Sequence, residues 1–169
     1  MAISMYAASV PVFRQMLNSL NDVLNKADAH ASAKKIDPNA LLQARLFPDM
    51  LPLARQVQIA SDFAKGACAR LAGMEIPSYE DKEQSFDELR ARIAKTLALI
   101  EGITPAQING SEEREVVIQQ GTPRERKFAG QTYLLHYALP QFLFHVTTAY
   151  AILRHNGVEI GKRDFMGSY

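Results

Sequence analysis

Apolar residues recur every three or four positions along four long segments of this chain, and this spacing limits its fold more than any other feature. Side chains at that spacing lie on one face of an α-helix, so each segment predicts a helix with one buried face. Four such helices predict an all-α fold, an antiparallel up-down four-helix bundle. The four stripes are Val10, Phe13, Leu17, Leu20 and Leu24; Met50, Leu53, Val57, Ala60, Ala64, Ala67 and Leu71; Phe86, Leu89, Ile93, Leu97 and Ile100; and Leu135, Leu139, Phe142, Val146, Ala149 and Leu153.

Proline and glycine mark the ends of the first two helices. The first segment covers residues 3–30, and Pro11 lies inside it. The helix therefore either begins near Ser9, with proline in its first turn, or carries a kink at Pro11. The second helix is predicted from Pro48 to Gly73, because glycine is favoured in the left-handed conformation that follows a helix.

The third and fourth helices also carry local signals. Ser85 and Glu88 have the S-x-x-E spacing of a capping box, so the third helix should begin there and end at Gly102. The fourth helix is predicted over residues 131–156. Pro140 lies inside it and should kink it, because proline removes one hydrogen bond of the helix.

The connections contain shorter predicted elements. Asp37 and Pro38 are typical of the cap and first residue of a short helix. Residues 115–119 are rich in β-branched side chains, and residues 126–129 could pair with them across an intervening turn. We interpret this stretch as a short β-hairpin before the last helix or, alternatively, as a long ordered loop. Residues 1–169 are expected to form a single domain.

Composition and charge exclude several classes of protein. The 169 residues are 47% hydrophobic and 22% charged, which is typical of a globular chain. The formal net charge of +1 gives no general electrostatic reason to bind nucleic acid or anionic lipid. The one cysteine, Cys68, cannot form an intramolecular disulfide and is interpreted as a small buried hydrophobe. No secretory signal or membrane-spanning run is visible, so we expect a cytoplasmic protein without a membrane partner.

Polar residues beside two of the apolar stripes form the candidate functional site. Helix positions that flank a core stripe are half-buried, and buried polar groups need partners. If the two polar lines face each other, their side chains can form hydrogen bonds inside the bundle, around His145. The lines are Arg55, Gln58 and Asp62 on the second helix and Gln141, His145 and Thr148 on the fourth.

The sequence alone leaves two interpretations of His145 open. In the first, it is a core histidine hydrogen-bonded to Gln58, Asp62 or Thr148, and the cluster binds at most a small polar ligand. In the second, His145 binds a metal ion with Asp62 as a second ligand, since bundles build metal sites from facing helices. Glutamine is a weak ligand for transition metals. The chain has no phosphate-binding glycine loop, nucleophile elbow, HExxH or CxxC motif.

Four runs of the sequence have the character of a family signature. They are Leu139–Tyr150 (LPQFLFHVTTAY), Ile152–Gly157 (ILRHNG), Gly161–Phe165 (GKRDF) and Leu46–Asp62, which contains PDM and ARQVQIA. Together they resemble an uncharacterised bacterial family, domain of unknown function nineteen ninety-three, over nearly the whole chain. That family is grouped with the DinB/YfiT-like superfamily of four-helix bundles.

The resemblance implies a metal site, an activity and an oligomeric state. Many DinB-like proteins bind a divalent metal such as zinc or nickel through three histidines, one on the second helix and two in a His-x-x-x-His pair. Several are metal-dependent thiol transferases or hydrolases, and they are often dimers. A Leu-Arg-x-x-Gly motif follows that pair, and Leu153–Gly157 places His145 at its second histidine. Gln141 then stands at the first histidine, and the ligand of the second helix falls near Gln58.

Two hypotheses for function follow. The favoured one is a non-catalytic or small-ligand-binding bundle with a degenerate metal site, because glutamine stands at two of the three ligand positions. The alternative is a divergent metal-dependent transferase or hydrolase that uses His145 with Asp62 and either Gln58 or Gln141. The aromatic residues of the fourth helix, among them Tyr133 and Tyr137, are interpreted as core and interface residues, and a homodimer through bundle faces is expected.

Overall fold

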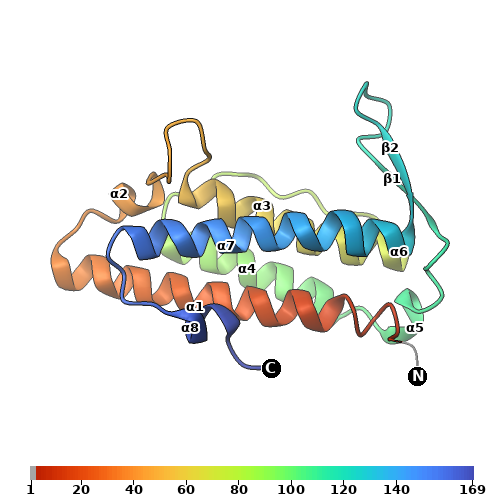
Figure 1. Cartoon of the computed structure of the whole chain (residues 1–169), viewed down its shortest axis with the longest axis horizontal. Coiled ribbons are helices and arrows are strands. Elements are labelled where there is room, and N and C mark those ends of the chain that lie inside the picture. The colour runs from red at the N-terminus through yellow and green to blue at the C-terminus, as the bar shows by residue number, and fades with distance from the viewer. Residues whose placement is uncertain (1–2) are drawn as a thin grey trace.

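Four long helices form the body of the protein, and a small hairpin stands at one end of them (Figure 1). The computed structural model describes residues 3–169. The predicted helical bundle with a short hairpin before its last helix is confirmed. The long helices are α1 (Val10–Lys34), α3 (Leu53–Ala72), α4 (Phe86–Glu101) and α7 (Leu139–His155).

The helices do not alternate strictly in direction. Helices α1 and α7 run one way, and α3 and α4 run the other way (Figure 1). The parallel course of α3 and α4 follows from residues 73–85, which return along the bundle as an extended crossover before α4 begins. The bundle is therefore up-down-down-up, where a regular up-down order was expected, because the periodic stripes specify faces and not directions.

Local signals account for most helix ends. Helix α1 begins after Ser9 with proline in its first turn, the first of the two alternatives predicted. It continues past His30 to Lys34, because Lys35 adopts the left-handed conformation that ends a helix. Helix α4 begins after Ser85, whose hydroxyl accepts a hydrogen bond from the Glu88 backbone N–H, as the capping box predicts. The first helix thus ends four residues later than the predicted segment, which ended at residue 30.

Helix α3 is shorter than predicted at its start. Residues 44–52 form an irregular loop, and α3 begins at Leu53, after Pro52, instead of at Pro48. Its end at Gly73 agrees with the prediction, since this glycine adopts the left-handed conformation. The Arg114 side chain donates a hydrogen bond to the Leu71 carbonyl group and so satisfies part of this helix end.

The core fills the space between the four long helices. Phe13 of α1 packs edge-on against Phe142 of α7, with 4.9 Å between the ring centroids. Cys68 is fully buried, and burial raises its pKa to about 12, so it is a small core residue as predicted. Within residues 3–169, no helix is both long enough and apolar enough to cross a membrane.

The segment between α4 and α7 contains a short helix and the hairpin. The helix is α5 (Pro105–Ile108), which the sequence did not predict, and the strands are β1 (Glu115–Ile118) and β2 (Arg126–Ala129). The strands pair antiparallel, with Val116 opposite Phe128. Val116 and Ile118 point into the core, which holds the base of the hairpin on the bundle.

The last long helix changes its pitch near its start. It opens with a single turn, α6 (Gly130–Thr132), passes through a π-helix, η1 (Tyr133–Ala138), and continues as α7. Proline cannot donate a backbone hydrogen bond, and its ring clashes with the carbonyl group four residues earlier. The wider π-turn just before Pro140 relieves this conflict.

Two short helices brace the outside of α1 and the loop before α3. Helix α2 (Pro38–Leu42) is capped by the Asp37 carboxylate, which accepts a hydrogen bond from the Asn39 backbone N–H at 2.9 Å. Helix α8 (Lys162–Met166) lies in the C-terminal tail. The Ser19 hydroxyl of α1 donates to the Asp164 carbonyl oxygen at 2.6 Å, which holds α8 against α1.

Gly130 should be needed for the joint between the hairpin and α6. A Cβ atom at this position would lie 2.0 Å from the Ser111 carbonyl oxygen, and neither backbone can move away easily. We predict that Gly130→Ala lowers the free energy of unfolding by about 1–3 kcal/mol in urea denaturation. Gly161→Ala is the control, because a Cβ at Gly161 meets nothing within 4 Å. Equal stability of the two variants would contradict the prediction.

Candidate functional site

His145 lies in the interior, as predicted, but its partner is a residue outside the predicted cluster. Its Nδ1 atom lies 2.7 Å from Oε1 of Gln56, and the side chain is 8% exposed. The Gln56 amide nitrogen donates to the Leu51 carbonyl oxygen at 3.0 Å, which turns the amide oxygen toward the imidazole. In the neutral ring, Nδ1 therefore carries the proton that is donated to Gln56. Burial lowers the pKa of His145, which favours this neutral form.

The expectation that Gln58 and Asp62 face His145 is wrong. The Gln58 amide donates to a carboxylate oxygen of Glu83 at 2.7 Å. Asp62 accepts hydrogen bonds from Arg92 at 2.9 Å and pairs with Lys65 at 2.9 Å. These residues lie on the face of α3 that meets the crossover and α4, because residues 56 and 58 are about 200° apart around a helix.

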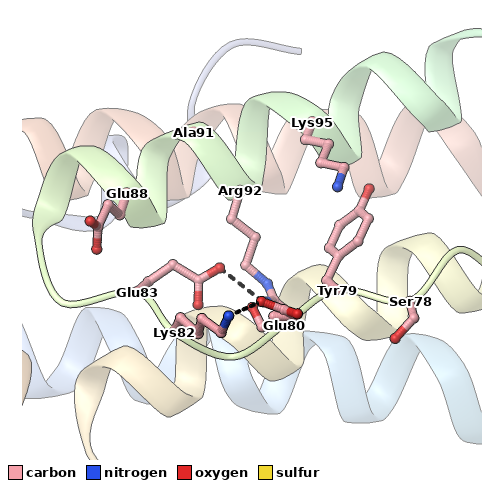
Figure 2. Close-up of a pocket in the computed structure, with 9 residues that line it drawn as sticks. All are labelled: Ser78, Tyr79, Glu80, Lys82, Glu83, Glu88, Ala91, Arg92 and Lys95. Carbon is pink, nitrogen blue, oxygen red and sulfur yellow. Dashed lines mark hydrogen bonds and ion pairs between the residues drawn. The ribbon is translucent and has the colours of Figure 1, made fainter.

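Arg92 is the centre of this second polar cluster. Its side chain is 2% exposed and pairs with Asp62, Asp81 and Glu83 at 2.9–3.1 Å. Figure 2 shows the side chain running from α4 toward the crossover, with Glu83 on one side and Tyr79 on the other. A buried guanidinium needs such partners, since its desolvation is otherwise costly.

The carboxylates around Arg92 are stabilised in their ionised form by the neighbouring arginines. Burial alone would raise the pKa of Asp81, but hydrogen bonds and charges from Arg55 and Arg92 lower it below the usual range. The pKa of Glu83 is lowered in the same way, against its own burial, by hydrogen bonds that include those from Arg92 and Gln58. The carboxylates therefore stay ionised at neutral pH and fasten the crossover to the bundle.

The remaining predicted site residues also lie apart from one another. The Thr148 hydroxyl donates to the Phe144 carbonyl oxygen of its own helix at 2.7 Å. Gln141 is half-buried and lines a hollow beside the hairpin. Of the predicted cluster of Gln58, Asp62, Gln141, His145 and Thr148, only Asp62 and Gln141 border the same region, beside the hairpin, and none of the other four is hydrogen-bonded to His145.

A cleft beside the hairpin is the best candidate for a functional site. It consists of two hollows, of about 190 Å³ and about 370 Å³, that share Ile118, Gln119 and Tyr137 in their walls. Small-molecule sites are typically concave and apolar with a few polar groups. We call this region the hairpin cleft, and its other lining residues are Asp62, Phe63, Arg70 and Tyr133 in the smaller hollow and Pro123, Arg124, Glu125, Arg126 and Gln141 in the larger.

Two unusual backbone conformations border the hairpin cleft. The π-helix η1 carries Tyr133 and Tyr137, and π-turns are frequent at functional sites. Gln119 has φ +51°, a left-handed conformation that is uncommon for a residue other than glycine. Both features lie in the wall of one cleft, and strained backbone tends to gather at ligand sites.

A chain of aromatic rings connects the hairpin cleft to His145. Phe63 stacks on His145 with 5.9 Å between the ring centroids, and its other neighbour is Tyr137, also at 5.9 Å. Tyr137 in turn stacks on Tyr133 at 5.9 Å. Tyr133 is buried, as the assignment of these aromatics to the core predicted, but Tyr137 and Phe63 keep part of their rings exposed in the cleft.

A spacing signal for these residues was present in the sequence. Gln56, Phe63 and Arg70 are seven residues apart on α3, so they share one face of that helix. This face was not predicted, because the candidate site was built from rows of polar residues and Phe63, at the centre of this face, is aromatic. Its partners on the last helix follow a four-residue spacing and are Tyr133, Tyr137, Gln141 and His145.

The stability of the protein should depend on pH through His145. Its pKa is lower in the folded protein than its usual value of about 6.5, so the unfolded chain takes up the proton first as the pH falls. Stability is therefore lost as the pH falls below about 6.5 toward the folded pKa. We predict that, from about pH 7.5 to about pH 5.5, the urea midpoint falls further for the native protein than for His145→Gln.

Parallel curves for the two proteins would contradict this account of His145. Asp81 and Glu83, whose pKa values are lowered, lose their contribution only at more acidic pH and in both proteins. The difference between the curves consequently reports on the imidazole. The amide group that the His145→Gln substitution introduces can still reach Gln56, so the comparison changes titration more than packing.

Comparisons with known proteins agree with this architecture. The family described as "Domain of unknown function (DUF1993)" matches residues 5–166. A crystal structure of a DinB family member protein from Shewanella denitrificans is 42% identical and has a TM-score of 0.89, covering 97% of this chain and 92% of that one. No curated protein matches the chain. The chain belongs to the DUF1993 family, within the DinB-like superfamily of helical bundles.

Proposed function

We propose that this protein binds a small organic ligand in the hairpin cleft and does not depend on a metal ion at His145. The observation that carries the proposal is the open aromatic wall formed by Phe63 and Tyr137, set between the π-helix and the hairpin. Planar rings bury a large area against such a wall and gain further from offset or edge-on ring contacts. The polar groups at the rim would orient the ligand.

The residues around His145 do not fit the three-histidine metal site that the resemblance implies. Nδ1 of His145 is engaged by Gln56, and the neighbouring rings of Phe63 and Phe144 offer no ligand atom. Among residues 3–169, no three or more His, Cys, Asp and Glu side chains come together in a way that could hold a metal ion. Zinc and nickel prefer imidazole and thiolate, so two glutamine amides with one histidine make a weak set.

The alternative of a divergent metal-dependent transferase or hydrolase draws less support. It requires Asp62 beside His145, but the Asp62 carboxylate is held by Arg92 and Lys65 on a different face of α3. A ligand-binding role requires no such rearrangement. It uses groups that already line the hairpin cleft, including Asp62 and Gln141 from the predicted site.

The ligand site can be tested with simple aromatic probes. We expect phenol, indole or benzoate to bind the native protein at millimolar concentration in ligand-observed NMR. Tyr137→Ala should weaken binding about tenfold, because it removes one of the exposed rings, and stacking contributes on the order of 1 kcal/mol beyond the buried area. Tyr150→Ala is the matched control, since Tyr150 is also half-buried but packs on Phe165.

Two outcomes would reject the hairpin cleft as a ligand site. One is that none of the three probes binds the native protein. The other is that Tyr137→Ala and Tyr150→Ala both bind the probes with the same affinity as the native protein. Melting curves of both variants show whether each protein is folded when it is tested.

We also propose that the outer face of α7 is covered by a second copy of the chain. The sequence has no Asp, Glu, Lys or Arg from Phe128 to Leu153. Leu143 and Phe144 are exposed on this helix, Phe144 by 55%, and they line an apolar groove with Leu46 and Met50. An uncharged apolar face is self-complementary, and a two-fold dimer brings the same face of both copies together.

The dimer predicts a definite mass in solution. Light scattering at micromolar concentration should give twice the chain mass of 18.8 kDa for the native protein. Phe144→Glu places a charge in the apolar face and should give the mass of a single chain. Met74→Glu changes an exposed apolar residue outside this groove and should remain dimeric. A single-chain mass for the native protein would refute the dimer.

A further inference from the structure

We infer that the ligand of the hairpin cleft carries an anionic group, such as a carboxylate, and that Arg70 binds it. This inference rests on the proposed ligand site and adds the chemical class of its occupant. An aromatic acid combines a ring for Phe63 and Tyr137 with an anion for the guanidinium. Arginine suits this role because its planar fork can hold both oxygens of a carboxylate.

Arg70 is half-buried in the cleft without an acidic partner. Its Nη1 atom donates to the Tyr133 hydroxyl oxygen at 3.2 Å, and over residues 3–169 no carboxylate lies within 4.0 Å of the guanidinium. The contrast with Arg92 is direct, since that guanidinium has three carboxylate neighbours. Partly desolvated cations are normally paired, so the charge of Arg70 is available to a ligand.

Helix α3 makes room for this guanidinium with a glycine. Gly66 lies one turn before Arg70, and a Cβ atom there would come within 2.6 Å of the Arg70 Nη1 atom. Glycine inside a helix is less stable than alanine by about 1 kcal/mol. The end of the Arg70 side chain therefore lies in space that a methyl group at position 66 would obstruct.

The charged groups of the cleft favour an anion over a cation, because Arg70, Arg124 and Arg126 outnumber the two carboxylates in its lining, Asp62 and Glu125. Arg124 and Arg126 line the hairpin side, and no carboxylate in the described part of the chain forms an ion pair with either one. The charge of Asp62 is offset by Arg92 and Lys65. The buried Tyr133 hydroxyl accepts a hydrogen bond from Arg70 and so helps to position the guanidinium in the wall of the cleft.

A pair of probes that differ in charge tests the inference. Benzoate and benzamide have the same ring and nearly the same shape, and only benzoate is an anion at neutral pH. The native protein should bind benzoate about tenfold more tightly than benzamide, the effect of one charge-assisted contact. Arg70→Gln should remove this preference and leave benzamide binding within about twofold of native. Arg14→Gln, an exposed arginine of α1, is the control.

Gly66→Ala gives a second test that keeps every charge. The added methyl group should displace the end of the Arg70 side chain, so the preference for benzoate should fall although the helix is no less stable. This variant remains informative if Arg70→Gln fails to fold.

The outcomes separate this inference from the proposed ligand site. If the native protein binds both probes equally and Tyr137→Ala weakens both, the ligand site stands and the inference about Arg70 falls. The inference also falls if either Arg70→Gln or Gly66→Ala, correctly folded, retains the full preference for benzoate. If neither probe binds the native protein, both the ligand site and the inference are overturned.

Discussion

The polar side chains of α3 are divided between two sets of neighbours, and this division decides where a functional site can form. Gln58 and Asp62 face the crossover and α4, where Arg92 engages Asp62 directly and reaches Gln58 through Glu83. Gln56 and Phe63 face α7, where they contact His145. The ion pairs of α3 therefore fasten the crossover to the bundle. The face of α3 toward α7 carries Gln56, Phe63 and Arg70.

This division follows from the direction of the helices. Because α3 and α4 run parallel, the chain must return along the bundle between them, and residues 73–85 do so in extended form (Figure 1). An extended segment has few backbone hydrogen bonds of its own and needs other anchors. Arg92 supplies them through Asp81, Glu83 and the Glu80 carbonyl oxygen. The Arg92 guanidinium is buried, so the loss of its carboxylate partners would leave a costly unpaired charge.

Much of the fold could be predicted from the sequence, because stripes and caps are local signals. The stripes located the four helices, and Ser85 and Gly73 marked ends correctly. The direction of α4 could not be predicted, since periodicity describes one helix at a time. The burial of His145 was predicted correctly, but its partner was not, because a row of polar residues does not say which helix it faces. The π-turn before Pro140 depends on the packing of the whole helix.

We propose that ligands bind beside Phe63 and Tyr137 and not at the pair formed by His145 and Gln56. The most direct test is a crystal of the native protein soaked with a library of small aromatic fragments and, separately, with zinc chloride. We expect fragment density in the hairpin cleft between α3, η1 and the hairpin, and no zinc at His145. Zinc bound to His145 with Gln56 or Gln141, together with a cleft free of fragments, would contradict this proposal.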